Sequence, residues 1–401
     1  MQAAPETNSR TPLAVLRVFL QLGCTAFGGP VAHLGYFHKE FVEKRRWIDE
    51  TGFADLVALC QFLPGPTSSQ VGFALGWKQA GYLGALCAWL GFTLPSAMLM
   101  LGFAYGVRQL HGLSGSGWVQ GLKIAAVAVV AQALWQMARR LCPDWPRISI
   151  GCLAAGLLVL VPTGWMQLAV IGGGALAGIL LEPQRRPVAE STTIRTIQQR
   201  YAGARWLVWF FALLLLLPLA ARFWPRQCLQ VVDGFYRTGS LVFGGGHVVL
   251  PLLQQATVGR GWLDHDTFLA GYGAAQALPG PLFAFAAYLG ATISIGPQGI
   301  LGGSLALLAI YLPSALLLFG VLPQWEWLRQ KPRAKAMLSG TNAAVVGLLA
   351  AAFYSPICTT ALTEPKAWGI ALVAGVGLMV GQLPPWLVVM ACALAGKLFL
   401  P

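Results

Sequence analysis

One ordered set of motifs occurs twice along the chain, and this duplication limits the folds that the chain can adopt more than any other feature. The set comprises an FGG motif, a Trp-x-Asp-x-x-x-Phe motif, a Gln-x-LPGP motif and a Leu-Pro-Ser motif. The two copies start, in the same order, at Phe27 and Phe243, Trp47 and Trp262, Gln61 and Gln276, and Leu94 and Leu312. The offset stays between 215 and 218 residues, which indicates a tandem duplication with halves of about 11–182 and 226–400.

Charged residues are scarce, which excludes two classes of protein. Only 10% of the 401 residues are charged and 56% are hydrophobic, whereas an ordinary soluble domain is about 25% charged. A soluble enzyme of this size would lack a charged surface, and a disordered chain would be far more polar. Because the apolar residues form long runs and do not alternate with polar ones, we predict an all-α polytopic membrane protein and not a β-barrel.

The excess of positive charge fits a membrane protein. The net charge is +13, and Lys and Arg collect in cytoplasmic loops, so we expect the lipid bilayer and no nucleic acid as partner. The eight cysteines form no C-x-x-C pair and are interpreted as small buried residues. His265 lies between Asp264 and Asp266, but this spacing is a weak metal signal. No hydrolase, zinc-protease or Walker A motif is present, so we expect no enzyme, metal or cofactor.

The basic loops alternate between the two halves. Loop 38–49 carries four Lys or Arg residues and its counterpart 253–264 carries one, whereas loop 105–118 carries one and its counterpart 323–336 carries four. Under the positive-inside rule, corresponding loops then face opposite sides of the membrane. The pattern predicts two inverted-topology repeats, which is a common architecture of secondary transporters.

An extra apolar segment separates the two repeats. Residues 206–224 form this segment, and they follow an Arg-rich linker that is predicted to be cytoplasmic. One additional membrane crossing places the second repeat in the opposite orientation to the first. The predicted organisation is an N-terminal repeat at 1–182, a linker with a connecting helix at 183–225 and a C-terminal repeat at 226–401, with about 13 helical membrane segments in all.

The segments around the glycine motifs are too interrupted to be simple spans. Residues 50–77 hold LPGP at their centre, and proline breaks helices, so each arm is shorter than the roughly 20 residues that a bilayer requires. We interpret 50–77 as a broken-helix hairpin, and likewise 11–44, 228–258 and 268–295. The sequence leaves open whether some of these arms are longer tilted helices that span.

The four breaks point to one interior site. Irregular backbone at membrane depth is tolerated where it lines a cavity, and the amides that follow LPGP lie at a helix start, where anions are attracted. A PGP sequence can also be a plain helix-to-helix turn. The predicted anion-binding residues on these motifs are Gly28, Gly29, Gln61, Gly65, Thr67, Ser68, Gly244, Gly245, Gln276 and Gly280.

Ionisable residues inside apolar segments add further candidates. Arg17, Lys123 and Arg237 are predicted to help hold an anion, with Asn342 in the position that corresponds to Lys123. The alternative is that the basic side chains reach the membrane interface. The candidates for coupling to a driving ion or for carrying protons are His33, Asp55, Asp233 and His247. A hydrogen-bonded structural role is the alternative for the histidines.

The duplicated FGG and PGP motifs, the WIDE and WLDHD loops and the segment FGGGHVVLPL at 243–252 resemble the chromate ion transporters over nearly the whole chain. The resemblance implies a bacterial inner-membrane protein that exports chromate from the cytoplasm, confers chromate resistance and draws on the proton motive force. Gly246 stands where the first half has Pro30, so the halves need not share the site equally. A sulfate or other oxyanion transporter and a passive anion channel are the alternatives, sulfate is the expected competing analogue, and a homodimer is a candidate assembly.

Overall fold

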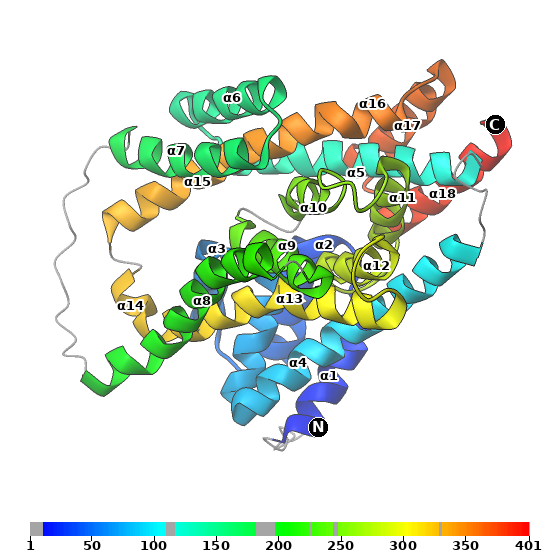
Figure 1. Cartoon of the computed structure of the whole chain (residues 1–401). Coiled ribbons are helices and arrows are strands. Elements are labelled where there is room, and N and C mark those ends of the chain that lie inside the picture. The colour runs from blue at the N-terminus through cyan, green and yellow to red at the C-terminus, as the bar shows by residue number, and fades with distance from the viewer. Residues whose placement is uncertain are drawn as a thin grey trace.

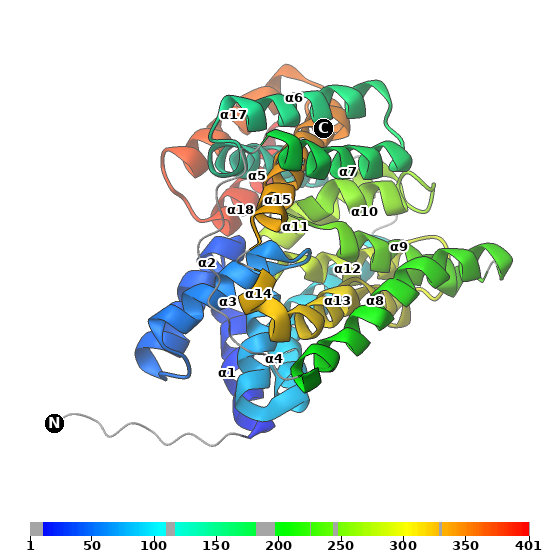
Figure 2. The ribbon, with the colours of Figure 1, turned by 90° about the vertical axis from the view of Figure 1, so that its left-hand side faces the viewer.

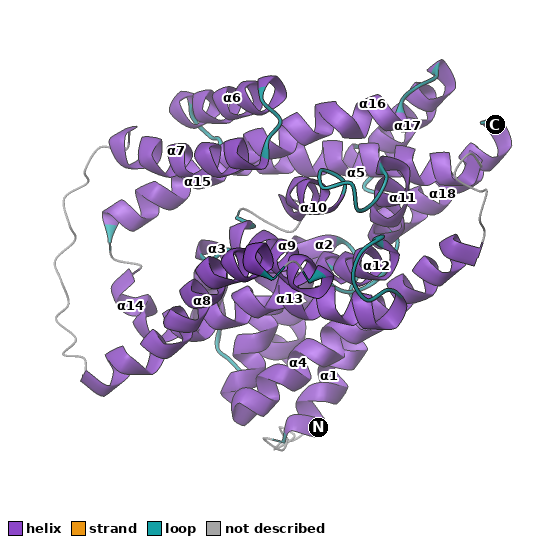
Figure 3. Cartoon of the chain, viewed as in Figure 1, coloured by secondary structure: helices purple, strands orange, loops and turns teal. Residues whose placement is uncertain are grey.

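The computed structural model describes residues 11–109, 117–181, 197–224, 226–243, 248–328 and 331–400. Every regular element within these ranges is a helix, and none is a strand (Figure 3). The predicted all-helical fold class is therefore confirmed for the part of the chain that the structure describes.

The described part of the first half contains seven α-helices and one π-helical turn in the order that the apolar runs predict. Their bounds are α1 Pro12–Thr25, α2 Gly29–Phe37, η1 His38–Lys44, α3 Glu50–Phe62, α4 Thr67–Gln109, α5 Gly117–Leu141, α6 Trp145–Leu160 and α7 Gly164–Leu181. The extra segment between the halves is helix α8, Ile197–Phe223.

The second half repeats this order with more interruptions. Its elements are α9 Gln227–Leu241, α10 Val249–Thr257, α11 His265–Gln276, η4 Leu282–Ala284, α12 Phe285–Thr292, α13 Gly299–Val321, η5 Leu322–Gln324, α14 Trp325–Leu328, α15 Pro332–Ala352, η6 Phe353–Cys358, α16 Thr359–Ala361, α17 Pro365–Met379 and α18 Pro385–Phe399. Each LPGP motif lies between two helices, as predicted, because its prolines and its left-handed glycine cannot continue a helix.

Among the described residues, six helical stretches are long and apolar enough to cross a membrane, judged by length and composition. One of them, Thr67–Val107, is not straight, because Ala80 and Gly81 have non-helical dihedral angles and divide α4 into two parts. Helices α6, α17 and α18 have 15 or 16 residues, which is fewer than the roughly 20 that a straight span requires. The number of 13 membrane segments therefore stays a prediction.

The helices form two layers (Figures 1 and 2). One layer holds α1, α4, α8, α9, α12 and α13, and the other holds α5, α6, α7, α15, α17 and α18. Each layer therefore mixes helices of both halves, and neither half is a separate globular unit.

Corresponding helices of the two halves exchange partners in the second layer. Helix α5 of the first half packs against α17 and α18, and α15 of the second half packs against α6 and α7. Glycines allow the close approach: a Cβ on Gly121 would meet the Cys392 carbonyl, and one on Gly340 would meet the Gly174 carbonyl. In Figure 1, α5 and α15 run in opposite directions.

Candidate functional site

The two LPGP turns meet the two FGG segments at the centre of the molecule. The amide of Gly65 donates a hydrogen bond of 2.7 Å to the carbonyl of Val242, which directly precedes the second FGG motif. The amide of Gly280 donates one of 2.9 Å to the carbonyl of Ala26, which directly precedes the first. Each turn is thus held by the other half, and the two contacts join corresponding positions.

The Leu-Pro-Ser motifs complete the same reciprocal pattern. A Cβ on Gly65 would overlap the hydroxyl of Ser314, and a Cβ on Gly280 would lie 2.8 Å from the hydroxyl of Ser96. Both glycines have left-handed φ angles, +123° and +92°, which side chains other than glycine rarely adopt. Three of the four duplicated motifs therefore come together at one place.

The start of α4 brings four polar side chains into this centre. Thr67, Ser68, Ser69 and Gln70 are all buried. The first backbone hydrogen bond of α4 runs from the amide of Gln70 to the carbonyl of Pro66. The amides of Thr67, Ser68 and Ser69 therefore have no acceptor within the helix. A buried helix start with free amides and hydroxyls is suited to an anion.

The corresponding helix start in the second half is apolar. Leu282, Phe283, Ala284 and Phe285 occupy the places of the four polar residues, and the first turn there is a short 3-10 helix. The central site is therefore asymmetric in its side chains even though its backbone contacts are reciprocal.

His33 lies beside this centre. Its ring is buried, with Nδ1 3.4 Å from the Ser68 hydroxyl and an edge-on contact of 5.2 Å between ring centroids with Phe92. Among the described residues, His33 is therefore a coupling candidate that contacts the polar start of α4.

Two of the three predicted cations have carboxylate partners. Lys123 of α5 is buried, and its Nζ lies 2.9 Å from Oδ1 of Asp266 on α11. Arg237 donates to both oxygens of Asp233, at 2.7 and 2.8 Å, one turn away on α9. Arg17 is exposed on α1. The three cations lie on three different helices, and the two that are paired have different carboxylate partners.

The Asp233 carboxylate is shared. Besides Arg237, the guanidinium of Arg260 lies 3.7 Å from it and stacks over Trp262 at 5.0 Å. Two arginines therefore lie within ion-pair distance of the one Asp233 carboxylate.

The remaining candidates lie around the centre or outside the described residues. Gln61 accepts a hydrogen bond of 3.0 Å from Arg140, and Asp55 is exposed on α3. Nε2 of Gln276 and Oδ1 of Asn342 are buried without a hydrogen-bond partner among the described residues. Gly28 and Gly29 form the turn between α1 and α2. Gly244, Gly245 and His247 lie outside the described residues.

Sequence reasoning missed several polar side chains at the centre. Ser96 and Ser314 belong to a motif that was recognised only as part of the repeat, and Thr93 and Tyr311 lie three residues before them. The repeat could have pointed to them. Polar residues at matching positions of two apolar helices lie on the same face in each half, and such faces can come together where the two halves pack.

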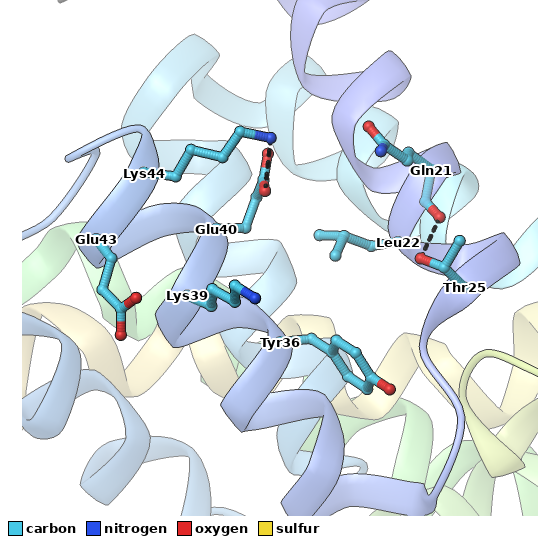
Figure 4. A pocket seen from close by; sticks show the side chains of 8 residues that line it. All are labelled: Gln21, Leu22, Thr25, Tyr36, Lys39, Glu40, Glu43 and Lys44. Atoms are coloured by element: carbon cyan, nitrogen blue, oxygen red, sulfur yellow. Dashed lines mark hydrogen bonds and ion pairs between the residues drawn. The ribbon is translucent and has the colours of Figure 1, made fainter.

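A cavity of about 480 Å³ lies between α1 and η1, and none of the residues that line it belongs to an LPGP turn (Figure 4). Lys39, Lys44, Glu40 and Glu43 line it, and Lys44 pairs with Glu40 at 3.3 Å. Two positive and two negative side chains leave it without the excess of positive charge that would attract a dianion. Among the described residues, no group of three or more His, Cys, Asp or Glu side chains could hold a metal ion.

Six long apolar helices and a polar centre enclosed by broken helices define a polytopic membrane protein of the transport class. A model of the chromate transporter family matches the chain twice, over residues 13–179 and 229–397. The chain belongs to this family, and it is a transport protein and not an enzyme.

Relatives of known description are similar over almost the full length. The chain is 28% identical over 391 residues to the probable chromate transport protein of Synechococcus elongatus, covering 95% of this chain and 94% of the relative. It is 29% identical to the chromate transport protein of Pseudomonas aeruginosa, with 96% and 91% covered, and 25% identical to that of Cupriavidus metallidurans, with 96% and 92% covered. No solved structure matches the chain.

Proposed function

We propose that this protein exports chromate from the bacterial cytoplasm across the inner membrane as a secondary transporter, and that it thereby confers chromate resistance. The family membership and the names of three full-length relatives support chromate as the substrate. The structural observation that carries the proposal is the buried polar start of α4, held between the two reciprocal turn contacts.

The two halves act as inverted-topology repeats in this proposal, with the N-terminal repeat at 1–182, the linker and α8 at 183–225 and the C-terminal repeat at 226–401. Support comes from the double family match, from the exchange of partners between α5 and α15, and from the alternation of the basic loops. Inverted repeats place the substrate at their interface, and that interface contains Gly65 and Gly280.

The electrical part of the proton motive force is sufficient to drive export of a dianion. Moving one charge across 100 mV changes the free energy by about 2.3 kcal/mol, and a dianion doubles this. Because the cell interior is electrically negative, the membrane potential favours the exit of the chromate dianion even without a coupled proton. A proton that moves inward in exchange for chromate would add to this force, with His33, Asp55, Asp233 and His247 as its candidate carriers.

The cations take part by exchanging partners in this proposal. Lys123 and Arg237 already hold a carboxylate, so either could bind the substrate only while Asp266 or Asp233 is released. Arg17, which is exposed on α1, would act at an entrance.

Uptake of labelled chromate into everted inner-membrane vesicles tests the function. Export in the cell becomes uptake in these vesicles, so we expect respiring vesicles that contain the protein to accumulate chromate. Valinomycin with potassium removes the electrical component and should abolish accumulation if the potential alone drives export, or lower it if a proton is also exchanged. Nigericin with potassium removes the pH component and should lower accumulation only if a proton is coupled. Vesicles that fail to accumulate chromate in excess of protein-free vesicles would contradict the proposal.

Two further arms separate the alternatives. A carrier shows counterflow, in which unlabelled chromate inside the vesicle accelerates uptake of the label, whereas a passive channel does not. Sulfate should compete with chromate in both a chromate transporter and a sulfate transporter, but a sulfate transporter would bind sulfate more tightly than chromate. Counterflow with preference for chromate is the result that the proposal requires.

A further inference from the structure

Three hydroxyl groups are buried together beyond the central turns. Ser69 lies in the first turn of α4, Thr93 in the second part of α4 and Tyr311 in α13, and each residue is at most 2% exposed. The phenol group of Tyr311 lies within interaction distance of the hydroxyls of both Ser69 and Thr93, although the geometry of neither contact is that of a hydrogen bond. The indole ring of Trp89 packs on the Tyr311 ring at 5.6 Å between centroids.

None of these hydroxyls makes a hydrogen bond of acceptable geometry with another described residue, and neither does the indole N–H of Trp89. Other buried hydroxyls of this chain are satisfied by the backbone: Tyr236 donates to the Phe210 carbonyl at 3.0 Å, and Thr257 donates to the Leu253 carbonyl at 2.7 Å. Burying a polar group without a partner costs free energy, so a cluster of such groups calls for a ligand or ordered water.

The cluster lies where the two halves meet. Thr93 and Tyr311 occupy corresponding positions of the repeat, 218 residues apart, and so do Ser96 and Ser314 one helical turn further on. Those two serines are the ones that face Gly280 and Gly65. The hydroxyl cluster is therefore one turn away from the contacts that hold the LPGP turns.

The first half supplies the additional donor. Ser69 lies in the first turn of α4, next to the backbone amides that have no acceptor within the helix, whereas the residue that corresponds to Ser69 is Ala284. The ring of Phe283 packs against Tyr311 at 5.7 Å on that side. Tyr311 thus contacts a polar residue at the start of α4 and an apolar residue at the corresponding helix start of the second half.

We propose that the hydroxyls of Ser69, Thr93 and Tyr311 bind a tetrahedral oxyanion dianion as neutral hydrogen-bond donors, an assignment that rests on the proposed transport function and specifies its site. Each O–H donates to one oxygen of the anion. Neutral donors satisfy the anion without a fixed counter-charge, so binding stays weak enough for release, as a transporter requires.

Three substitutions remove the hydroxyls with little change of shape: Ser69→Ala, Thr93→Val and Tyr311→Phe. The matched controls are Thr257→Val and Tyr236→Phe, which remove buried hydroxyls that have backbone partners. Chromate and sulfate affinities are measured by calorimetry on the purified full-length protein, together with thermal unfolding in anion-free buffer and chromate uptake in proteoliposomes.

Each single variant should weaken chromate binding by about tenfold, and the triple variant should lose it, while both controls keep the wild-type affinity. In anion-free buffer the three variants should unfold at or above the wild-type temperature, because an unpaired buried polar group has been removed, whereas both controls should unfold lower. Unchanged affinity in the triple variant, as expected if the cluster only holds water, would overturn the assignment.

The two proposals fail separately. If the wild type transports chromate and the triple variant does so with the same affinity, only the hydroxyl site is wrong. If the wild type binds sulfate through these hydroxyls but does not transport chromate, the site stands and the proposed function is wrong. If the wild type binds neither anion, the site is overturned.

Discussion

At the level of single residues, both the backbone conformation and the available space require glycine at the two LPGP turns. The left-handed φ angles of Gly65 and Gly280 exclude most side chains, and the hydroxyls of Ser314 and Ser96 occupy the space where a Cβ would lie. The same amides donate across the interface between the halves. A side chain at either position would therefore disturb the turn and its contact with the other half together.

Gly65→Val and Gly280→Val should each abolish chromate transport while the protein still inserts into the membrane. The control is Gly102→Val, because a Cβ on Gly102 meets no atom within 4 Å. Uptake in vesicles with matched protein amounts is the measurement. Normal transport by both turn variants would show that the turns do not shape the site.

The pair of Lys123 and Asp266 allows a test of partner exchange. If Lys123 holds the anion after leaving Asp266, Lys123→Ala should weaken chromate binding about ten- to a hundredfold, and Asp266→Asn should strengthen it by freeing the ammonium group. Calorimetric titration of both variants is the measurement. Unchanged affinity in both variants would mean that the pair is structural.

At the scale of elements, the breaks in the helices were predictable and their three-dimensional partners were not. Proline and glycine in LPGP end a helix whatever surrounds them, so the ends of α3 and α11 follow from the sequence. The predicted hairpin ends at residue 77, close to the bend of α4 at Ala80 and Gly81, where Gly81 has a left-handed φ of +61°. The close packing of the two parts of α4 through Gly76 and Gly84 was not predictable.

The turn η1 carries a pH-dependent contact outside the membrane-spanning segments. Nε2 of His38 lies 2.7 Å from Oε2 of Glu50, and Nδ1 lies 3.2 Å from Oε1 of Glu43. The hydrogen bond to Glu50 and the negative charges of both carboxylates raise the pKa of His38 above its ordinary value of 6.5. The stabilisation is complete below that ordinary value and is lost as pH rises through the raised pKa.

His38→Gln should therefore lower the unfolding temperature slightly near pH 6 and leave it unchanged near pH 9, where the imidazole of the wild type is neutral. Thermal unfolding of both proteins in the same detergent across that range is the measurement. Parallel curves for the two proteins would contradict the assigned ion pairs.

At the scale of the whole molecule, the duplication determined what could be foreseen. The repeat predicted that the LPGP and FGG motifs converge, and the reciprocal bonds of Gly65 and Gly280 place them together. The partner of Lys123 could not be foreseen, because Asp266 belongs to the other half and meets it only through the packing of α5 against α11. The buried hydroxyls were missed because each is ordinary within its own helix.

Opposite orientation of the repeats predicts opposite accessibility of corresponding loops. In a cysteine-free background, Glu43→Cys should react with an impermeant maleimide from the cytoplasmic side and Gln255→Cys from the outside. The comparison of intact cells with everted vesicles is the measurement, with uptake assayed in each variant to show that it is folded. Reaction of both cysteines from one side would contradict the inverted repeat.

We propose that the anion binds between the two halves, at the turns that each half holds for the other. A structure of the protein with chromate bound would locate the ion through the anomalous signal of chromium. We expect the ion within hydrogen-bond reach of the start of α4, between Gly65 and Gly280. A chromium site far from both turns would contradict it.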